Sequence, residues 1–174
     1  MTRMRRLFLA ASALAAGFVI FHGQLAAAMV TRGDDALRNG DVNTAIRFYD
    51  RATRLDPASV VAADRLAFEL ALRHDRGAAT QAIVVATQAL TRNATDPSLF
   101  ADRGFAEVQL RRWRDAERDF SRAGSLAHDA RYEHFAGRMA LHSADRNAAR
   151  RYALLALGDD PGFMPARSML QTLR

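Results

Sequence analysis

The sequence contains no cysteine and no lysine. Without cysteine the chain has no disulfide, no thiolate metal site and no cysteine nucleophile. Without lysine it has neither a Schiff-base amine nor the lysine of a phosphate-binding P-loop. Only four prolines and ten glycines occur in 174 residues, which excludes a collagen-like or proline-rich polymer. These absences remove several classes of protein before any motif is considered.

The composition that remains points to one helical domain. A length of 174 residues suits about one domain, and a hydrophobic fraction of 49% with 25% charged residues is ordinary for a folded protein. Alanine is abundant and β-branched runs are few, which favours closely packed helices. The net charge is +6, but three arginines lie within the first six residues. The rest of the chain is only weakly basic, so we expect no nucleic-acid partner.

The N-terminal segment, residues 1–28, has the pattern of a targeting sequence. Arginines at positions 3, 5 and 6 precede an uncharged and mostly apolar stretch, residues 7–21, and Ala26 and Ala28 form a small-x-small exit. This pattern is typical of a secretory signal peptide cleaved near Ala28. Residues 7–30 carry no Asp, Glu or Arg, and that length also suits an uncleaved membrane anchor. Both alternatives place residues 29–174 in the bacterial cell envelope, outside the cytoplasm: periplasmic or secreted if cleaved, inner-membrane anchored if not.

Three residues at fixed spacing recur four times along the chain. Each copy has an alanine, four residues later an aromatic residue or alanine, and three residues later another alanine. The copies are Ala45-Tyr49-Ala52, Ala82-Ala86-Ala89, Ala116-Phe120-Ala123 and Ala149-Ala153-Ala156. Their first residues are 37, 34 and 33 apart, and each trio falls on one face of a helix. A repeat of this length indicates stacked helix pairs.

A second landmark lies upstream of each trio. Gly33, Gly104 and Gly137 each precede the first alanine by 12 residues, whereas Ala67 precedes Ala82 by 15. We therefore expect about three extra residues in the internal turn of the second unit, near residues 74–78. Asp-Pro pairs, which begin helices, stand between units at residues 56–57, 96–97 and 160–161.

On these residues the chain resembles tetratricopeptide repeat (TPR) proteins. The first unit matches through residues 40–46 and 52–57, and the third through Gly104, Trp113, Ala116, Phe120 and Ala123. The resemblance implies an all-α fold, an α-solenoid of about four antiparallel helix pairs followed by a C-terminal capping helix. The expected units are about residues 29–59, 60–96, 97–129 and 130–163, and the expected capping helix is residues 164–174.

The sequence shows no arrangement that would support catalysis. It has no glycine-rich phosphate loop, no His-Glu-x-x-His and no Gly-x-Ser-x-Gly. Its glutamates lie inside predicted helices, where we expect them to be solvated or locally paired: Glu69, Glu107, Glu117 and Glu133. We therefore expect no catalytic residue, no cofactor and no metal site, and a protein that is not an enzyme.

In TPR proteins the first helix of each pair lines a concave surface, so the resemblance implies a candidate partner-binding face. Its residues are Arg38, Asp64, Phe68, Leu72, Phe105, Gln109, Arg131, His134, Arg138 and His142. Phe68 and Phe105 form a hydrophobic recess in this interpretation; with the register shifted by one residue, both belong to the core. Arg131, His134, Arg138 and His142 fall on one side of a helix. They form either a basic groove wall or a solvated polar face.

The function expected from the sequence is protein binding without catalysis. A scaffold or adaptor would hold a partner segment, acidic or C-terminal, in the concave face. The alternative is a structural subunit that self-associates, or that is tethered through an uncleaved N-terminal segment, and uses its convex face. On that face, arginines at positions 114, 118 and 122 alternate with acidic residues, which indicates local ion pairs.

Overall fold

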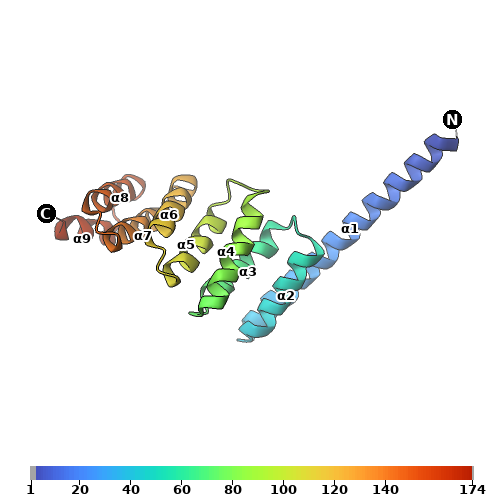
Figure 1. The fold of residues 1–174 in the computed structure, drawn as a ribbon, viewed down its shortest axis with the longest axis horizontal. Coiled ribbons are helices and arrows are strands. Elements are labelled where there is room, and N and C mark those ends of the chain that lie inside the picture. Colours follow the sequence, from blue (N-terminus) through green and yellow to red (C-terminus); the bar gives the residue numbers. More distant parts are fainter. Residues whose placement is uncertain (1–2, 174) are drawn as a thin grey trace. The chain divides into compact units, whose positions relative to one another are not determined.

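The computed structural model describes residues 20–173 in full and residues 3–19 as helical backbone. This part of the chain contains helices and no strand (Figure 1). The helices are α1 (Arg3–Arg38), α2 (Val42–Leu55), α3 (Val60–Ala71), α4 (Arg76–Leu90), α5 (Pro97–Gln109), α6 (Trp113–Ala127), α7 (Ala130–His142), α8 (Arg146–Asp159) and α9 (Met164–Thr172). The predicted all-α fold, an α-solenoid of four helix pairs with a C-terminal capping helix, is confirmed, and the cap is α9.

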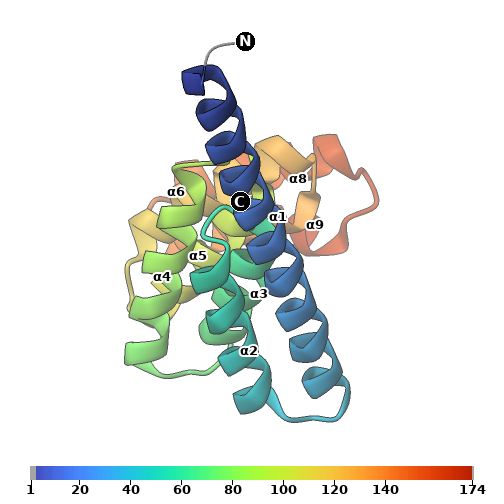
Figure 2. The ribbon, with the colours of Figure 1, turned by 90° about the vertical axis from the view of Figure 1, so that its right-hand side faces the viewer.

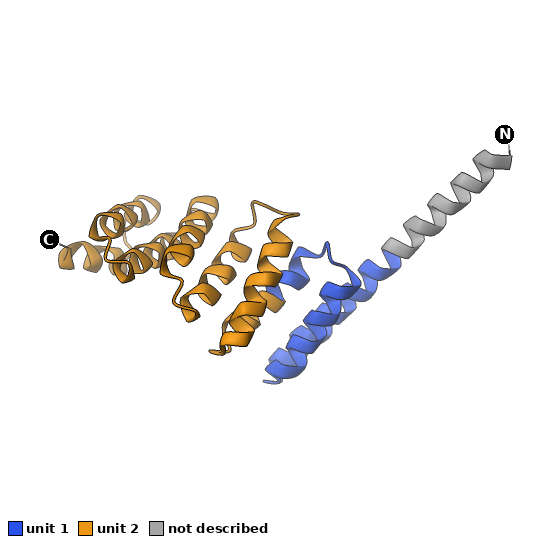
Figure 3. Ribbon diagram, viewed as in Figure 1, with its two compact units in different colours: residues 1–65 blue, residues 66–174 orange. Residues whose placement is uncertain are grey.

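The chain forms two compact units, residues 1–65 and residues 66–174, with the boundary inside α3 (Figure 3). In the first unit α1 and α2 lie side by side and run in opposite directions (Figure 2). In the second unit each of the helices α4 to α9 packs against the next along the chain. The cores are built largely from alanine, which lets neighbouring helix axes approach closely.

The first helix passes through the predicted boundary between residues 28 and 29. Ala26 and Met29 are buried in the core of the first unit together with Ala52 of α2, and Leu25 packs against the same cluster. Residues assigned to the targeting segment therefore help to fill this core. Residues 3–19 of that segment are described as helical backbone only, so the predictions that depend on their side chains lie outside what the structure describes. Within residues 20–173 no helix has the length and apolar character needed to cross a membrane.

Three of the four turns inside the helix pairs have the same backbone geometry. Gly40, Arg111 and Ala144 adopt left-handed φ values of 78°, 58° and 61°. In each case the next residue donates its N–H to a carbonyl five residues back, at 2.9 Å, as in a Schellman turn. At the corresponding turn of the second pair, His74 is also left-handed, with φ 51°.

The second pair corrects the predicted register of its alanines. Its N-cap residue, Asp75, lies eight residues after Ala67, just as Asp41 lies eight after Gly33. The internal turn is therefore not lengthened, and the trio equivalent to the others is Ala79-Ile83-Ala86. The predicted trio, Ala82-Ala86-Ala89, was wrong by three residues. The alanine pattern could not show this, because Ala79, Ala82, Ala86 and Ala89 are all buried. The extra residues lie in the connection between α4 and α5, residues 91–96.

Small and large residues alternate between the paired helices. Gly33 of α1 faces the ring of Tyr49, and Gly104 of α5 faces the ring of Phe120. Both rings are fully buried. In the second pair the equivalent positions are Ala67 and Ile83, a larger residue on the first helix and a smaller one on the second. Gly33 and Gly104 therefore make room for a large side chain on the second helix of their pair.

Candidate partner-binding surface

Six of the ten predicted partner-binding residues occupy equivalent positions in successive helix pairs. Phe68, Phe105 and Arg138 each follow the landmark residue directly, and Leu72, Gln109 and His142 lie one helical turn further on. All six belong to the second unit. Their surroundings nevertheless differ, so they do not form one uniform face.

The last turn of α3 carries the most exposed apolar side chains of this set. Phe68 is 41% exposed and Leu72 is 51% exposed, four residues apart. The side-chain amide of Gln109 on α5 donates a hydrogen bond to the backbone carbonyl of Ala71, next to Leu72. This contact holds the end of α5 against the end of α3. Two large apolar side chains therefore stand in solvent beside a fixed polar group.

Phe105 is half-buried and packs against the core. Its ring makes edge contacts with Phe120 at 4.9 Å and with Phe135 at 5.3 Å between centroids. These three rings pack in the cluster that includes Ala116 and Met139. The sequence left open whether Phe68 and Phe105 are exposed or packed against the core. Phe105 is packed against the core, and Phe68 is exposed. The contacts of Phe105 with α6 and α7 account for the difference.

The predicted basic stripe on α7 is smaller than the sequence suggested. Arg131 is tied to Asp129, with Nη2 donating to Oδ2 at 2.6 Å and Nε to Oδ1 at 3.0 Å. His134 lies half-buried with its ring 5.7 Å from that of Phe163, and its buried Nδ1 has no hydrogen-bond partner. Burial, and secondarily Arg138, lowers the pKa of His134, so its neutral form is favoured. Arg138 itself is exposed.

His142 is exposed but has an aromatic neighbour. Its ring stacks on the indole of Trp113 at 4.4 Å, with the planes 17° apart. Leu141, the adjacent residue on α7, is 37% exposed. We define the first-helix surface of the second unit as Phe68, Leu72, Gln109, Arg138, Leu141 and His142. This surface combines exposed apolar side chains with one free guanidinium group.

Two predicted residues lie in the first unit. Arg38 is exposed near the end of α1 and bonds to Asp35, one turn earlier. Asp64 is half-buried on α3. Nearby, Asp34 accepts a hydrogen bond from the hydroxyl of Tyr49 at 2.7 Å and lies 3.6 Å from Nε of Arg65. In this unit the polar side chains chiefly serve the packing of α1, α2 and α3.

For two of the glutamates, the expectation of a solvated or locally paired side chain was wrong. Glu107 of α5 is 7% exposed and Glu133 of α7 is 4% exposed, and Oε2 of each is buried without a hydrogen-bond partner. Burial, and then Asp119 and Asp115, raises the pKa of Glu107 to about 8. Burial, and then Asp159, raises the pKa of Glu133 to about 7. Near neutral pH, Glu107 is therefore mostly protonated and Glu133 is divided between its two forms.

Only one feature of the sequence signals the buried position of Glu133. Gly124 lies inside α6, and a Cβ there would come within 2.6 Å of Oε1 of Glu133. Asp119, another buried carboxyl group of the second unit, is instead paired with an arginine. It accepts two hydrogen bonds from Arg103, at 2.6 and 2.8 Å. Within residues 20–173 no cluster of His, Asp or Glu side chains could hold a metal ion.

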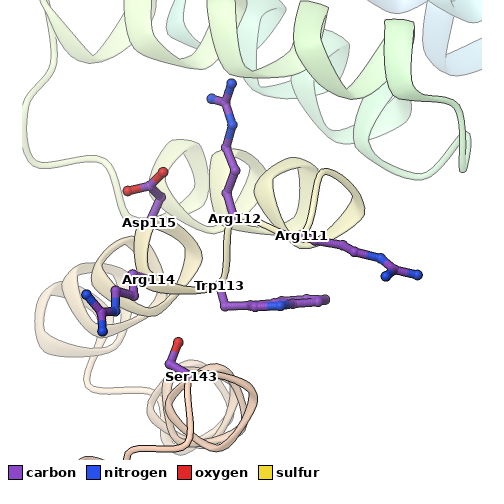
Figure 4. A pocket seen from close by; sticks show the side chains of 6 residues that line it. All are labelled: Arg111, Arg112, Trp113, Arg114, Asp115 and Ser143. Atoms are coloured by element: carbon purple, nitrogen blue, oxygen red, sulfur yellow. The ribbon is translucent and has the colours of Figure 1, made fainter.

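The turn between α5 and α6 carries a shallow hollow of about 320 Å³ (Figure 4). Its lining residues are Arg111, Arg112, Trp113, Arg114, Asp115 and Ser143. Arg112 occupies the N-cap position of α6 and makes no side-chain cap. The equivalent residues of the other pairs, Asp41, Asp75 and Asp145, each accept a hydrogen bond from a helix N–H. The N-cap residue of this turn is therefore basic where those of the other three are acidic.

These helix pairs have the TPR fold. A MamA protein superposes with a TM-score of 0.75 at 20% identity, over 87% of this chain and 81% of MamA. TTC0263, a thermophilic TPR protein of Thermus thermophilus, superposes at 0.66 with 18% identity, over 99% of this chain and 98% of its own. One chain of the APC/C Cut9–Hcn1 hetero-tetramer superposes at 0.66 with 16% identity, over 83% of this chain and 29% of its own. Comparison with protein-family models gives no match, and sequence comparison with curated proteins gives none either.

Proposed function

We propose that the protein is a non-catalytic scaffold or adaptor, and that its first-helix surface binds a segment of a partner protein. The observation that carries this proposal is the exposure of Phe68 and Leu72 at the end of α3. Large apolar side chains that stand in solvent on adjacent turns are typical of binding surfaces. The structure of Cut9 with Hcn1 supports the same use of the fold, since that neighbour is part of a hetero-tetramer.

The charges on this surface define the chemistry of the partner. Phe68 and Leu72 offer an apolar contact, whereas Arg138, which has no ion-paired partner among the described residues, offers a cation on α7. A segment with an apolar side chain and a carboxylate, either acidic or C-terminal, satisfies both. A guanidinium group can bind such a carboxylate through two parallel hydrogen bonds.

Selection of peptides from a displayed random library against the purified protein tests this proposal. For selected peptides we expect Phe68→Ala, Leu72→Ala and Arg138→Glu each to lower the affinity about tenfold, since each removes about 1.4 kcal/mol of contact energy. Isothermal titration calorimetry measures the effect.

The matched controls are Leu154→Ala and Arg150→Glu, which make the same chemical changes at exposed positions of α8. Their affinities should equal that of the unaltered protein. Peptides that bind the first-helix variants and the control variants equally would show that the partner segment lies elsewhere.

A second candidate function is self-association. Leu154 and Leu155 are adjacent on α8 and are 54% and 53% exposed. A second copy of the chain that covered them would bury apolar area now in water. Light scattering at micromolar concentration distinguishes the two functions. A self-associating protein has a mass above 19.2 kDa, and Leu154→Ser with Leu155→Ser returns it to that value.

We propose in addition that the helical body lies in a bacterial cell envelope, outside the cytoplasm, and that residues 20–28 stay attached to it. The arginines at positions 3, 5 and 6 before an uncharged stretch support the location. The packing of Leu25 and Ala26 against α2 supports retention, since cleavage after Ala28 would remove both from the core.

We expect removal of residues 1–28 to destabilise the first unit more than removal of residues 1–19. The difference is about 2–3 kcal/mol, because the longer deletion exposes the surface that Leu25 and Ala26 cover. Urea denaturation of the two truncated proteins measures it. Equal stabilities, or an intact mass from the native host about 3 kDa below 19.2 kDa, would contradict retention.

A further inference from the structure

The hollow at the α5–α6 turn has an unusual concentration of unpaired positive charge. Arg111, Arg112 and Arg114 are all exposed, and none has a hydrogen-bonded or ion-paired side-chain partner among the described residues. Asp115 also lines the hollow, but Arg118 donates to its carboxylate at 2.5 Å. The local positive charge is therefore not balanced from within the chain.

One wall of the hollow is aromatic. The indole of Trp113 projects from the turn in the same direction as the side chain of Arg111, and Ser143 lies on the far side of the indole (Figure 4). His142 stacks on Trp113 and fixes its orientation. The hollow has a volume of about 320 Å³. It therefore offers a flat apolar wall beside three cations.

Arg112 adds positive charge to the hollow but leaves α6 without an N-terminal cap. Arg112 stands where the three other second helices have an aspartate N-cap, so α6 lacks the side-chain hydrogen bond that caps α2, α4 and α8. An N-cap of this kind stabilises a helix. Position 112 therefore adds a positive charge to the hollow and no cap to α6.

We propose that this hollow is a second binding site of the protein, and that it takes a carboxylate-rich segment of another protein. Charge complementarity identifies the ligand as anionic. The three guanidinium groups point in different directions: Arg112 toward α4, Arg111 along the indole, and Arg114 away from both (Figure 4). A flat membrane surface meets cations that point one way, whereas a peptide can pass between diverging ones. The site adjoins the first-helix surface at His142, which stacks on Trp113, but Phe68 and Leu72 do not line it.

Trp113 is the only tryptophan in the sequence, so its fluorescence reports on this hollow and on the adjoining side chain of His142. The probe is a peptide of alternating glutamate and serine, with alternating lysine and serine as the control peptide. We expect the acidic peptide to change the Trp113 emission in a saturable manner. Salt should weaken this binding, since screening shortens the range of the charges. The lysine peptide should have no effect.

Arg111→Glu combined with Arg114→Glu is expected to lower the affinity for the acidic peptide about tenfold or more. Arg150→Glu combined with Arg151→Glu makes the same change in net charge on exposed residues of α8 and should leave the affinity unchanged. Phe68→Ala should also leave it unchanged, which separates this test from that of the first-helix surface.

Arg112→Asp separates binding from folding. It restores the N-cap found in the other pairs, so the unfolding midpoint should rise by about 2–4 °C while peptide affinity falls. No fluorescence response to the acidic peptide, or an equal loss of affinity in the α8 control, would overturn the proposal. A response to vesicles of phosphatidylserine without a response to the peptide would also overturn it and would assign the hollow to a membrane surface.

Discussion

Replacing Gly33 with alanine is expected to destabilise the first unit by about 2–4 kcal/mol. A Cβ at this position would lie 2.3 Å from Cε1 of Tyr49, far inside van der Waals contact. Tyr49 is fully buried, and its hydroxyl donates a hydrogen bond to Asp34 at 2.7 Å. The ring therefore cannot move aside without losing that bond or separating α1 from α2. Urea denaturation measures the loss of stability.

Two other glycines give a graded series of controls. At Gly104 the added Cβ would lie 3.1 Å from the ring of Phe120, so Gly104→Ala should cost less, about 1 kcal/mol. Gly158 has no atom within 4 Å of such a Cβ, and it lies in α8. Gly158→Ala should be neutral or stabilising by up to about 1 kcal/mol, since alanine favours helix. A Gly33 variant as stable as the Gly158 variant would show that close packing does not explain these glycines.

The same packing explains why the fold could be predicted from the sequence. A large residue on the second helix requires a small one on the first, so Gly33 and Gly104 recur at a fixed distance from Tyr49 and Phe120. Such pairs leave a periodic trace along the chain. Aspartate at the N-cap after three of the four internal turns adds a second trace, because its side chain accepts a hydrogen bond from a helix N–H. Local rules of this kind act within a single pair.

These rules did not predict which alanines of α4 form the trio equivalent to those of the other pairs. Five alanines of this helix are buried, at positions 78, 79, 82, 86 and 89, so burial does not distinguish between two alignments three residues apart. Ile83 of the true trio is neither aromatic nor alanine, which concealed it. Only the position of Asp75 as N-cap distinguishes the alignments, and it does so by its side-chain hydrogen bond to the N–H of Ala78.

The candidate site was harder to predict because neighbouring helices decide which of its side chains are exposed. Phe68 and Phe105 follow equivalent landmarks, yet only Phe105 meets other rings, from α6 and α7. The ring of Phe163, in the connection before α9, lies against His134 and partly covers it. Helical periodicity places a residue on a face, but the size of the residues opposite decides whether that face is covered.

The stability of the second unit is expected to fall by about 2–3 kcal/mol between pH 6.5 and pH 8.5. The pKa of Glu107 is raised to about 8 and that of Glu133 to about 7, both chiefly by burial. In the unfolded chain both carboxyl groups ionise near pH 4.5, the ordinary value. The folded state therefore binds more protons in this window, and the stability that these protons provide is lost as the pH rises through the folded pKa values. Thermal unfolding at the two pH values measures the difference.

The pH range is chosen to exclude opposing groups. The pKa of His134 is lowered, so this residue reduces stability only as the pH falls below its ordinary value of 6.5. The pKa values of Asp41, Asp75 and Asp129 are lowered from 3.8, so their contributions are lost only in more acidic solution. Above pH 6.5 the two buried glutamates therefore dominate the change among the groups with shifted carboxyl or imidazole pKa values.

Glutamine at position 107 keeps the shape of the side chain and removes its titration. Glu107→Gln is therefore expected to reduce the fall in stability to about 1 kcal/mol, the share of Glu133, and to be more stable than the unaltered protein at pH 8.5. Adding Glu133→Gln should abolish the dependence. If the single and double variants both kept the original dependence on pH, the protons would reside on other groups, and the buried carboxyl groups of α5 and α7 would be ionised in the folded protein.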